Sequence, residues 1–260
     1  MQRAKDKVVV VLGASSEGGT GWRTAEVFAR EGAKVVVAAR GFAGVHNLAE
    51  RIGGVAHRCD AGDEAQVAAL ADFAAETYGQ IDYAVNAAGL PVPSTVADLD
   101  AETLLSSTQV NLFGHLYFLK HMARHTAAGG SLISIASLSA TAVIPGNVIY
   151  GVAKAGVVAA IRYAAVEFAP RGIRVNAISP GIIDTPMVES LTSNPAILRG
   201  FLNETPLGSV VPPEEIGECA LWMCVDALSM TGTSTIIDGG MHLRRPPHPE
   251  DLAADAYANL

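Results

Sequence analysis

Three side chains in the second half of the sequence have the types and the spacing for acid–base chemistry. Tyr150 and Lys154 are four residues apart at the start of a predicted helix, so both project from one face of it. An ammonium group beside a phenol favours the phenolate and lowers a phenol pKa that starts near ~10. Tyr150 would then exchange a proton with an alcohol or a carbonyl, and Ser137, at the end of a predicted strand, would donate to the same oxygen. A lone Y-x-x-x-K pair is more often an ordinary exposed pair, so this prediction depends on a cofactor site beside it.

A glycine-rich turn near the N-terminus predicts such a cofactor site. Residues 13–21, GASSEGGTG, follow an apolar strand and lead directly into a helix. Glycines let the chain turn tightly and bring its backbone close to a pyrophosphate, and the helix N-terminus supplies N–H groups to the phosphates. A turn that uses glycine for purely structural reasons is the alternative. The residues that we assign to a dinucleotide site here are Gly13, Ser15, Ser16, Gly19 and Gly21.

The choice between the two nicotinamide cofactors depends on the end of the second strand. A carboxylate there would accept from the ribose hydroxyls of NAD, whereas a basic side chain would pair with the 2′-phosphate of NADP. Arg40 stands at this point, and the nearest acid on the next helix, Glu50, is too far along to serve. Against this, Glu17 in the turn would repel a phosphate, and Arg40 is also compatible with a solvated loop position. We therefore expect NADP(H), with NAD(H) as the alternative.

Short apolar runs alternate with Ala-rich helical stretches along the whole chain. The runs lack polar–apolar alternation, which is typical of parallel strands covered by helices on both faces. The sequence therefore predicts an α/β fold with one doubly wound parallel sheet of the Rossmann type, in a single catalytic domain over residues 1–240. The predicted strands are 8–12, 34–39, 55–59, 82–86, 131–136, 173–178 and 234–238, and the predicted helices are about 20–31, 43–52, 63–78, 101–127, 149–169 and 213–225.

Composition excludes several classes of partner. With 260 residues, 50% of them hydrophobic and 17% charged, the chain can build one large core. A net charge of −8 argues against nucleic acid and acidic membrane surfaces. Three cysteines without a C-x-x-C pair indicate reduced thiols, and no segment is typical of a signal peptide, so we expect a cytoplasmic protein. His121 and His125 have the spacing of a metal pair, but no H-E-x-x-H pattern accompanies them, and we expect no metal.

Seven motifs stand in the order and spacing of the short-chain dehydrogenase/reductase family, which the chain resembles over about residues 7–240. They are GASSEGGTG (13–21), CDAGD (59–63), VNAAG (85–89), VNLFG (110–114), Ser137 followed by YGVAK (150–154), IRVNAISPGIIDTPM (173–187) and DGG (238–240). The resemblance implies a nicotinamide cofactor and a catalytic set of Ser137, Tyr150, Lys154 and Asn111. In such a set Asn111 would hold a water on the proton path to Lys154.

The resemblance also implies a set of cofactor contacts. Asp60 would contact the adenine, Asn86 and Gly89 would lie beside the cofactor, and Lys154 would bind the nicotinamide ribose. Pro180 and Gly181 lie in the same motif as Ile183 and Thr185, the two residues that would contact the carboxamide.

Two departures from the family pattern bear on the cofactor. Common members have three residues between the first two glycines of the turn, whereas five precede Gly19 here, a length found in the enoyl-acyl-carrier-protein reductase branch. Trp22 also stands where that branch often has an aromatic residue. That branch spaces its Tyr and Lys seven apart, so the four-residue spacing of Tyr150 and Lys154 argues against it. The longer loop weakens the expectation of NADP(H).

Subunit contacts are predicted at two places. The helix 149–169 has small residues on more than one face, and in the family this helix pairs between subunits, so we expect a homo-oligomer, most simply a tetramer. Residues 241–260 form a tail whose three prolines, 246, 247 and 249, would carry it away from the sheet edge. Its apolar spacing suggests docking on a neighbouring subunit, with a frayed terminus as the alternative.

The segments expected to line the substrate side are 90–93, 138–144 and 187–201, and they are almost free of charge. They favour a small hydrophobic secondary alcohol or ketone as the substrate. Two other functions remain open at this point: a non-catalytic nicotinamide-binding sensor, and an epimerase or dehydratase that uses its bound cofactor. A sensor would have no reason to keep the four catalytic residues together.

Overall fold

The predicted parallel sheet is present, and it has the strand order β3-β2-β1-β4-β5-β6-β7. The structure, a computed structural model, describes residues 2–248, without the side chains of residues 190 and 191. The strands are β1 (Val8–Leu12), β2 (Lys34–Ala39), β3 (Val55–Arg58), β4 (Ile81–Asn86), β5 (Thr126–Ile135), β6 (Arg174–Pro180) and β7 (Ser234–Ile237). The strand order reverses between β1 and β4, which opens a crevice at the carboxyl ends of these strands.

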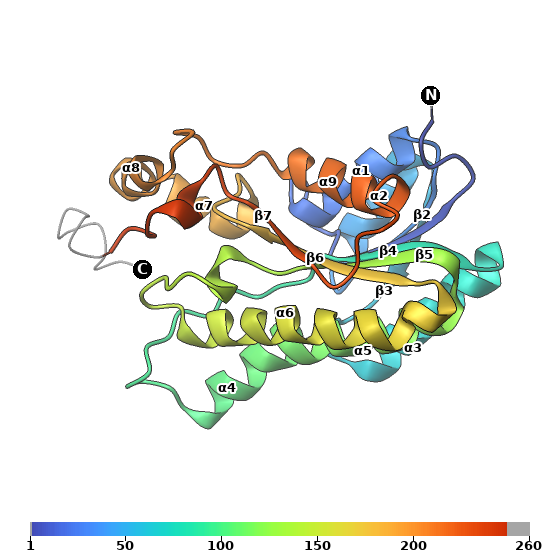
Figure 1. The fold of residues 1–260 in the computed structure, drawn as a ribbon, viewed down its shortest axis with the longest axis horizontal. Helices are drawn as coiled ribbons and strands as arrows, with labels where there is room; N and C mark the ends of the chain where they lie inside the picture. The colour runs from blue at the N-terminus through green and yellow to red at the C-terminus, as the bar shows by residue number, and fades with distance from the viewer. Residues whose placement is uncertain (1, 249–260) are drawn as a thin grey trace.

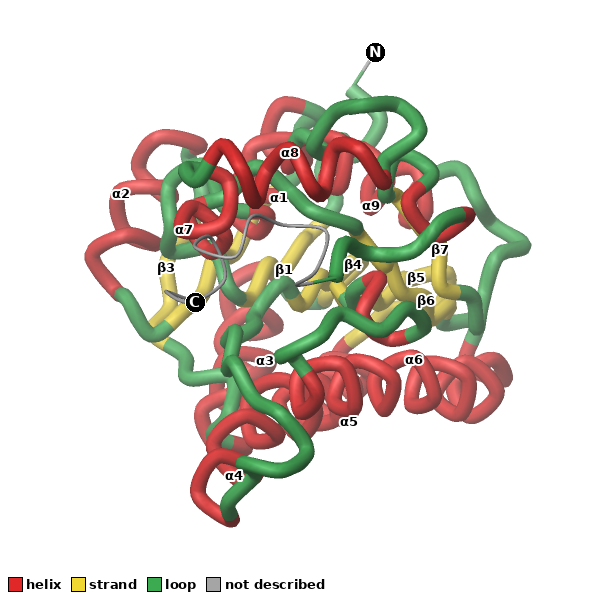
Figure 2. The backbone as a smooth tube through the Cα atoms, turned by 90° about the vertical axis from the view of Figure 1, so that its left-hand side faces the viewer, coloured by secondary structure: helices red, strands yellow, loops and turns green. Residues whose placement is uncertain are grey.

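Helices cover both faces of the sheet (Figures 1 and 2). One face carries α1 (Thr20–Arg30), α2 (Phe42–Ile52) and α9 (Pro213–Val225); the other carries α3 (Glu64–Tyr78), α5 (Gly114–His125) and α6 (Val148–Phe168). Two short helices, α7 (Glu189–Thr192) and α8 (Pro195–Glu204), lie at the end of the molecule where α6 begins (Figure 1).

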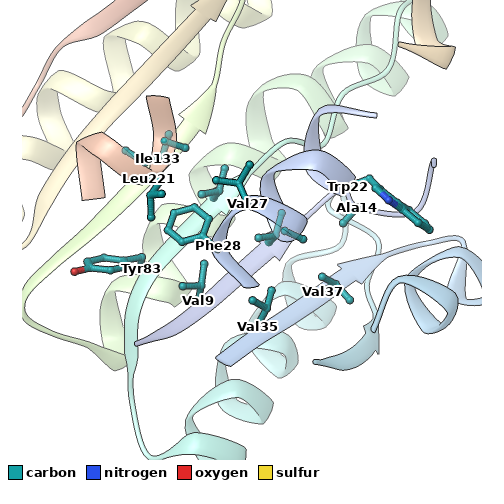
Figure 3. Close-up of a cluster of buried hydrophobic side chains, with 14 of the residues drawn as sticks. Val9, Ala14, Trp22, Val27, Phe28, Val35, Val37, Tyr83, Ile133 and Leu221 are labelled. Atoms are coloured by element: carbon teal, nitrogen blue, oxygen red, sulfur yellow. The ribbon is translucent and has the colours of Figure 1, made fainter. Parts of the chain in front are cut away.

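The core explains why the strands have continuous apolar sequences. Val9 and Val11 of β1 point to the face covered by α1 and α9, while Val10 and Leu12 point to the face covered by α3, α5 and α6. Figure 3 shows the first of these clusters, with Phe28 of α1 between the strands and α9. Both faces of β1 are therefore buried, as the sequence predicts for a parallel strand.

The helix predicted over 101–127 is broken, and this is a correction. It consists of α4 (Ala101–Thr108), a π-helical turn (Gln109–Phe113) and α5, and β5 already begins at Thr126. The break occurs where the Asn111 side chain bonds to the backbone of Leu90, in the loop after β4. A side chain held by a neighbouring segment offers a physical reason for the wider turn.

The C-terminal segment follows a different course from the predicted one. Met241 is buried with Leu138, and Pro246 and Pro247 are also buried in the same chain. The first two prolines of the tail therefore pack back on the chain, and the expectation that they carry it away from the sheet edge is wrong for them. The rest of the predicted tail, residues 249–260, lies outside the described residues.

One helical stretch among residues 2–248, Val148–Arg171, is long and apolar enough to cross a membrane by length and composition. It contains α6, and buried residues such as Val157 and Ile161 pack it against the sheet. It is therefore a core helix of this sheet-and-helix fold.

Candidate active site

The catalytic residues meet at the carboxyl end of β5. Ser137 follows that strand and accepts a hydrogen bond from the Ser139 backbone N–H (3.1 Å), which begins a short 3₁₀ turn over Leu138–Ala140. Tyr150 and Lys154 lie in the first two turns of α6, with the Lys154 Nζ 5.6 Å from the centroid of the Tyr150 ring. The Ser137 side chain lies close enough to the Tyr150 phenol to influence its pKa. The structure thus brings together three residues that are far apart in the sequence.

Ser94 anchors the beginning of α6. The helix has no side-chain cap of its own at Asn147, but Ser94 Oγ accepts from the Ile149 backbone N–H (3.3 Å), and the Ser94 carbonyl accepts from the Val148 N–H (3.3 Å). These bonds end one residue before Tyr150. The loop after β4 therefore positions the tyrosine.

Burial controls the protonation of both titrating groups. It raises the pKa of Tyr150 to about 12, and the Ser137 side chain acts in the opposite direction. It lowers the pKa of Lys154, which is only 2% exposed, to about 7. The expectation that Lys154 lowers the pKa of the phenol is therefore wrong for the protein by itself, because desolvation has the larger effect.

The Lys154 ammonium makes two buried contacts. Its Nζ donates to the Ile135 backbone carbonyl (2.9 Å) and lies 3.1 Å from Nε2 of His115, the second residue of α5. His115 is fully buried, and none of the sequence motifs predicts a role for it. Its place one residue after the VNLFG motif is the signal that could have identified it.

Asn111 lies beside this group. Its Oδ1 accepts from the Leu90 N–H (2.9 Å), and its Nδ2 donates to the Leu90 carbonyl (2.8 Å) and to Ser107 Oγ (3.2 Å). A Cβ built on Gly89 would lie 3.7 Å from Asn111 Oδ1 and 3.9 Å from Lys154 Nζ. All four residues of the predicted catalytic set therefore lie around one end of β4 and β5.

The glycine-rich turn has the close approaches that its glycines predict. A Cβ on Gly13 would lie 2.5 Å from the Ala88 nitrogen, and one on Gly21 would lie 2.4 Å from the Gly13 carbonyl oxygen. Gly19 is the N-cap residue of α1, which has neither a side-chain cap nor an acid in its first turn. The first N–H groups of α1 are therefore available to a phosphate.

The residues of the longer turn have partners within the chain. Glu17 pairs with Arg51 of α2 (3.3 Å), and Arg51 pairs with Glu26 of α1 (3.1 Å). Ser15 packs under α2, where a Cβ on Gly44 would lie 2.1 Å from the Ser15 carbonyl oxygen. Ser16 accepts from the Gly19 N–H (2.9 Å) and closes the loop. The negative charge of Glu17 is thus compensated by an arginine.

A cavity of about 350 Å³ lies at the ends of β2 and β3, and Arg40, Arg58, Asp60 and Gln66 line it. Asp60 Oδ1 accepts from the Gly62 N–H (2.9 Å), and Gln66 Oε1 accepts from the Asp60 N–H (2.9 Å). Within residues 2–248, neither arginine has an ion pair with an acidic residue. The sequence analysis missed Arg58, although its position at the end of a strand beside Cys59 could have indicated it.

The remaining cofactor candidates lie on the same edge of the sheet. Asn86 is buried, and its Oδ1 accepts from the Ala88 N–H (2.9 Å). Pro180 ends β6, and Gly181 packs on Asp238, whose Cβ would be 2.7 Å from a Cβ at this glycine. Ile183 bridges to Val211, and Thr185 precedes a short 3₁₀ turn.

An apolar cluster lies next to Ser137. It joins Leu138 to Ile182, to Ile197 and Phe201 of α8, and to Met241 at the start of the C-terminal segment. Two of the three segments that we expected on the substrate side, 138–144 and 187–201, therefore meet there. The helices in the second were not predicted; α8 begins at Pro195 and is capped by the Asn194 side chain, which accepts from the Ala196 N–H.

The two histidines that were considered as a metal pair each bond to a carboxylate. His121 Nε2 lies 3.1 Å from Glu64 Oε1, and His125 Nε2 lies 2.7 Å from Asp72 Oδ1. The described residues contain no group of three or more potential metal ligands.

Comparisons with known proteins agree with this geometry. Residues 13–242 match the profile of the protein family described as Enoyl-(Acyl carrier protein) reductase. The chain is 36% identical to the cis-4-hydroxycyclohexanecarboxylate dehydrogenase of Sinomonas cyclohexanicum, over 90% of this chain and 96% of that protein. It is 33% identical to the D-threitol dehydrogenase of Mycolicibacterium smegmatis, over 93% and 95% of the two chains.

A solved structure has the same fold. A short-chain type dehydrogenase/reductase from Mycobacterium ulcerans superposes with a TM-score of 0.90 at 28% identity, over 95% of this chain and 93% of that one.

Proposed function

Because the chain belongs to the short-chain dehydrogenase/reductase family, and is therefore an oxidoreductase that uses a nicotinamide cofactor, we propose that it interconverts a hydrophobic secondary alcohol and its ketone with NADP(H). The meeting of Ser137, Tyr150 and Lys154 beside an apolar cluster carries this proposal. Ketone reduction needs a proton donor at the carbonyl oxygen, and the half-buried Tyr150 is such a donor.

The protein's own residues account for the proton chemistry. Tyr150 donates its phenol proton to the carbonyl oxygen, and Ser137 donates a hydrogen bond to the same oxygen as negative charge develops on it. The Lys154 ammonium stabilises the phenolate that remains. Asn111 bonds to Leu90 and lies on the side of Gly89 that Lys154 also approaches, where it would hold a water on the proton path. The nicotinamide ring, when bound, supplies or accepts the hydride.

The residues present fit an adenine dinucleotide. The uncapped N-terminus of α1 and the close approach at Gly13 suit the pyrophosphate, with Ser15, Ser16, Gly19 and Gly21 shaping the turn. Asp60 would contact the adenine, and Asn86, Gly89, Pro180, Gly181, Ile183 and Thr185 would surround the nicotinamide half.

Arg40 and Arg58 support the choice of NADP(H). Two guanidinium groups that line one cavity form a site for the 2′-phosphate, which NAD(H) lacks. Glu17, which argued for NAD(H), has an arginine partner in Arg51.

Apolar residues beside the catalytic set support a hydrophobic cyclic substrate. The cluster of Leu138, Ile182, Ile197, Phe201 and Met241 makes the surroundings of Ser137 apolar and contains no charged group. The relative that acts on cis-4-hydroxycyclohexanecarboxylate supports a cyclic alcohol. The threitol dehydrogenase indicates that polyols belong in the test as well.

Three free cysteines fit a reducing compartment, and we place the protein in the cytoplasm, as a homotetramer. The exposed apolar face of α6 supports the assembly. Val152, Ala155, Ala159, Tyr163 and Val166 lie on one side of that helix and are exposed in the single chain.

The experiment is a panel of cyclic, aromatic and open-chain ketones and alcohols, monitored at the absorbance of the reduced nicotinamide with each cofactor. We expect turnover of a cyclic secondary alcohol or its ketone with NADP(H). The Tyr150→Phe variant should lose 10²-fold or more of that turnover, as an order of magnitude, and still bind NADPH. Turnover in Tyr150→Phe close to that of the unchanged protein would refute the mechanism. Cofactor binding without any turnover would favour a sensor, and isomerisation or loss of water without net reduction would favour an epimerase or dehydratase.

A further inference from the structure

His115 is a buried imidazole in contact with the catalytic lysine. It is 0% exposed, and its Nε2 lies 3.1 Å from the Lys154 Nζ. The same Nζ donates to the Ile135 carbonyl (2.9 Å). An ammonium has three N–H groups, so these two partners leave one N–H for a third. A Cβ built on Gly89 would lie 3.9 Å from the Lys154 Nζ and 3.7 Å from Asn111 Oδ1. The space beside Gly89 is therefore close to both side chains.

The protonation of the ring follows from its surroundings. Burial and the positive charge of Lys154 both lower the pKa of His115 well below its ordinary value, so the ring is neutral at physiological pH. Of its two nitrogens, Nε2 faces the lysine, whereas Nδ1 has no hydrogen bond of normal geometry to the described residues. A neutral ring carries one proton, and the Lys154 ammonium offers only donors to Nε2. That proton belongs on Nδ1, which leaves the Nε2 lone pair for Lys154.

We propose that His115 is a positioning residue for Lys154: its Nε2 accepts a hydrogen bond from the ammonium, keeps that group charged, and directs its remaining N–H toward the cofactor side of Gly89. This inference rests on the proposed function, because the phenol and ribose contacts of Lys154 are what His115 would support. An acceptor that bonds to an ammonium stabilises its charged form against burial.

The other groups around Lys154 and His115 do not replace His115 in keeping the ammonium charged. The groups are Tyr150 on α6, Asn111 on the π-helical turn, the Ile135 carbonyl on β5 and the Ala88 backbone after β4. All are neutral when the phenol is protonated, so Lys154 is the charged member among them. The carbonyl of Ile135 accepts one N–H but has a fixed position, so the lysine depends on His115 for its second acceptor.

The first test observes the ring directly and needs no substrate. In protein labelled with ¹⁵N-histidine, NMR should show His115, identified by its loss in His115→Gln, as a neutral ring with the proton on Nδ1 from pH 6 to pH 9. In Lys154→Met the same ring should regain a measurable titration at higher pH, because a positive neighbour has been removed. A proton on Nε2 of His115, or a ring unaffected by Lys154→Met, would overturn the proposal.

The second test compares two replacements of the ring. His115→Leu keeps an apolar volume but removes the acceptor, whereas the amide oxygen of His115→Gln can take its place. We expect His115→Leu to lower kcat for ketone reduction about tenfold and to weaken NADPH binding severalfold, as loss of a hydrogen bond to a charged group would. His115→Gln should restore most of both.

The pH profile separates positioning from a purely structural role. Without its acceptor the Lys154 ammonium loses its proton more easily, so the alkaline decline of kcat should begin about one pH unit lower in His115→Leu. The matched control is His121→Gln, a buried histidine on the same helix that bonds to Glu64. Its profile should match the unchanged protein.

Each outcome decides one question. An unshifted profile in folded His115→Leu, or no recovery in His115→Gln, would refute the positioning role. Should His115→Leu fail to fold, the NMR result and His115→Gln still decide it. Absence of any turnover in the unchanged protein would instead count against the proposed function, while NADPH binding and the NMR result continue to test His115.

Discussion

Tyr150 illustrates how burial sets the direction in which a single residue works best. Burial raises its pKa to about 12, so the phenol keeps its proton at neutral pH and is ready to donate. Ketone reduction uses that proton, whereas alcohol oxidation needs the phenolate. We expect kcat/KM for alcohol oxidation to rise steadily from pH 7 to pH 10, as the phenolate fraction of Tyr150 increases.

Ser137 provides the check on this prediction. Its side chain lowers the pKa of the phenol, so Ser137→Ala should move the alkaline rise of oxidation to higher pH. An oxidation rate that stays level between pH 7 and pH 10 would contradict the prediction.

The two arginines at the ends of β2 and β3 lead to a second prediction. Removing either Arg40 or Arg58 with alanine should weaken NADPH binding about tenfold and leave NADH binding nearly unchanged, because the 2′-phosphate is the group that we propose they contact. Arg40→Asp should go further and favour NADH. Fluorescence titration with both cofactors measures the effect.

A matched control is Arg30→Ala, which removes the same charge from α1, where Arg30 pairs with Glu214. If the unchanged protein already prefers NADH, the assignment of this cavity is wrong.

Among single residues, the sequence predicted those whose proposed function depends on motif spacing. Ser137, Tyr150, Lys154 and Asn111 meet as the resemblance implies. His115 and Arg58 were missed, since their significance comes from neighbours brought by other strands and helices. The direction of the Tyr150 pKa was also wrong, because residue types alone do not give the extent of burial.

Among the secondary-structure elements, the π-helical turn carries Asn111, which bonds to the loop beside the catalytic lysine. Asn111→Ala would leave the Leu90 N–H and carbonyl without their partner, at a cost of about 1–3 kcal/mol in the free energy of unfolding. We expect kcat to fall with it, since Leu90 follows Gly89 beside Lys154. Urea denaturation and steady-state kinetics measure the two effects.

Gln109→Ala is a comparison within the same turn, since its amide bonds to Gly62 and not to Leu90. A change in Asn111→Ala that is no larger than in Gln109→Ala would contradict the assigned role of the asparagine.

The elements were predicted best where periodicity alone decides them. Six of the seven strands lie within two residues of their predicted bounds, because most of them are short apolar runs, whereas β5 begins five residues earlier than predicted. The break at Asn111 was missed because it depends on a bond to Leu90, more than twenty positions away in the sequence. The two helices after β6 were missed because the segment was treated as a substrate loop, although Asn194 followed by Pro195 is a helix start signal.

For the whole molecule, the exposed face of α6 predicts assembly. Tyr163 is 79% and Val166 is 78% exposed on a helix whose other side lies in the core. Val166→Glu with Tyr163→Lys should place charges in a contact between copies and reduce the molar mass measured by light scattering to that of a smaller species. A control with Leu228→Glu, an exposed apolar residue after α9, separates this face from others. A monomeric unchanged protein would refute the predicted tetramer.

The tail gives a further prediction at this scale. Since Met241, Pro246 and Pro247 are buried in their own chain, docking on a neighbouring subunit is left to residues beyond 248. Removing residues 249–260 should reduce the oligomer or raise KM while leaving the thermal midpoint nearly unchanged. Unchanged oligomer size together with unchanged KM would dispose of the docking role.

The π-helical turn also has a consequence for the shape of the surface. Each residue of an α-helix turns the chain by roughly 100° about the helix axis. The π-helical turn holds one residue more than a regular turn, so α4 is rotated relative to α5 by about that angle. Leu105 of α4 is 64% exposed, whereas Phe118 and Met122 of α5 are buried. The π-helical turn that brings Asn111 to Leu90 therefore also lies between a helix with an exposed apolar side chain and a helix with a buried apolar face. We therefore expect a mutation that regularised this helix to alter the catalytic centre and the outer surface together.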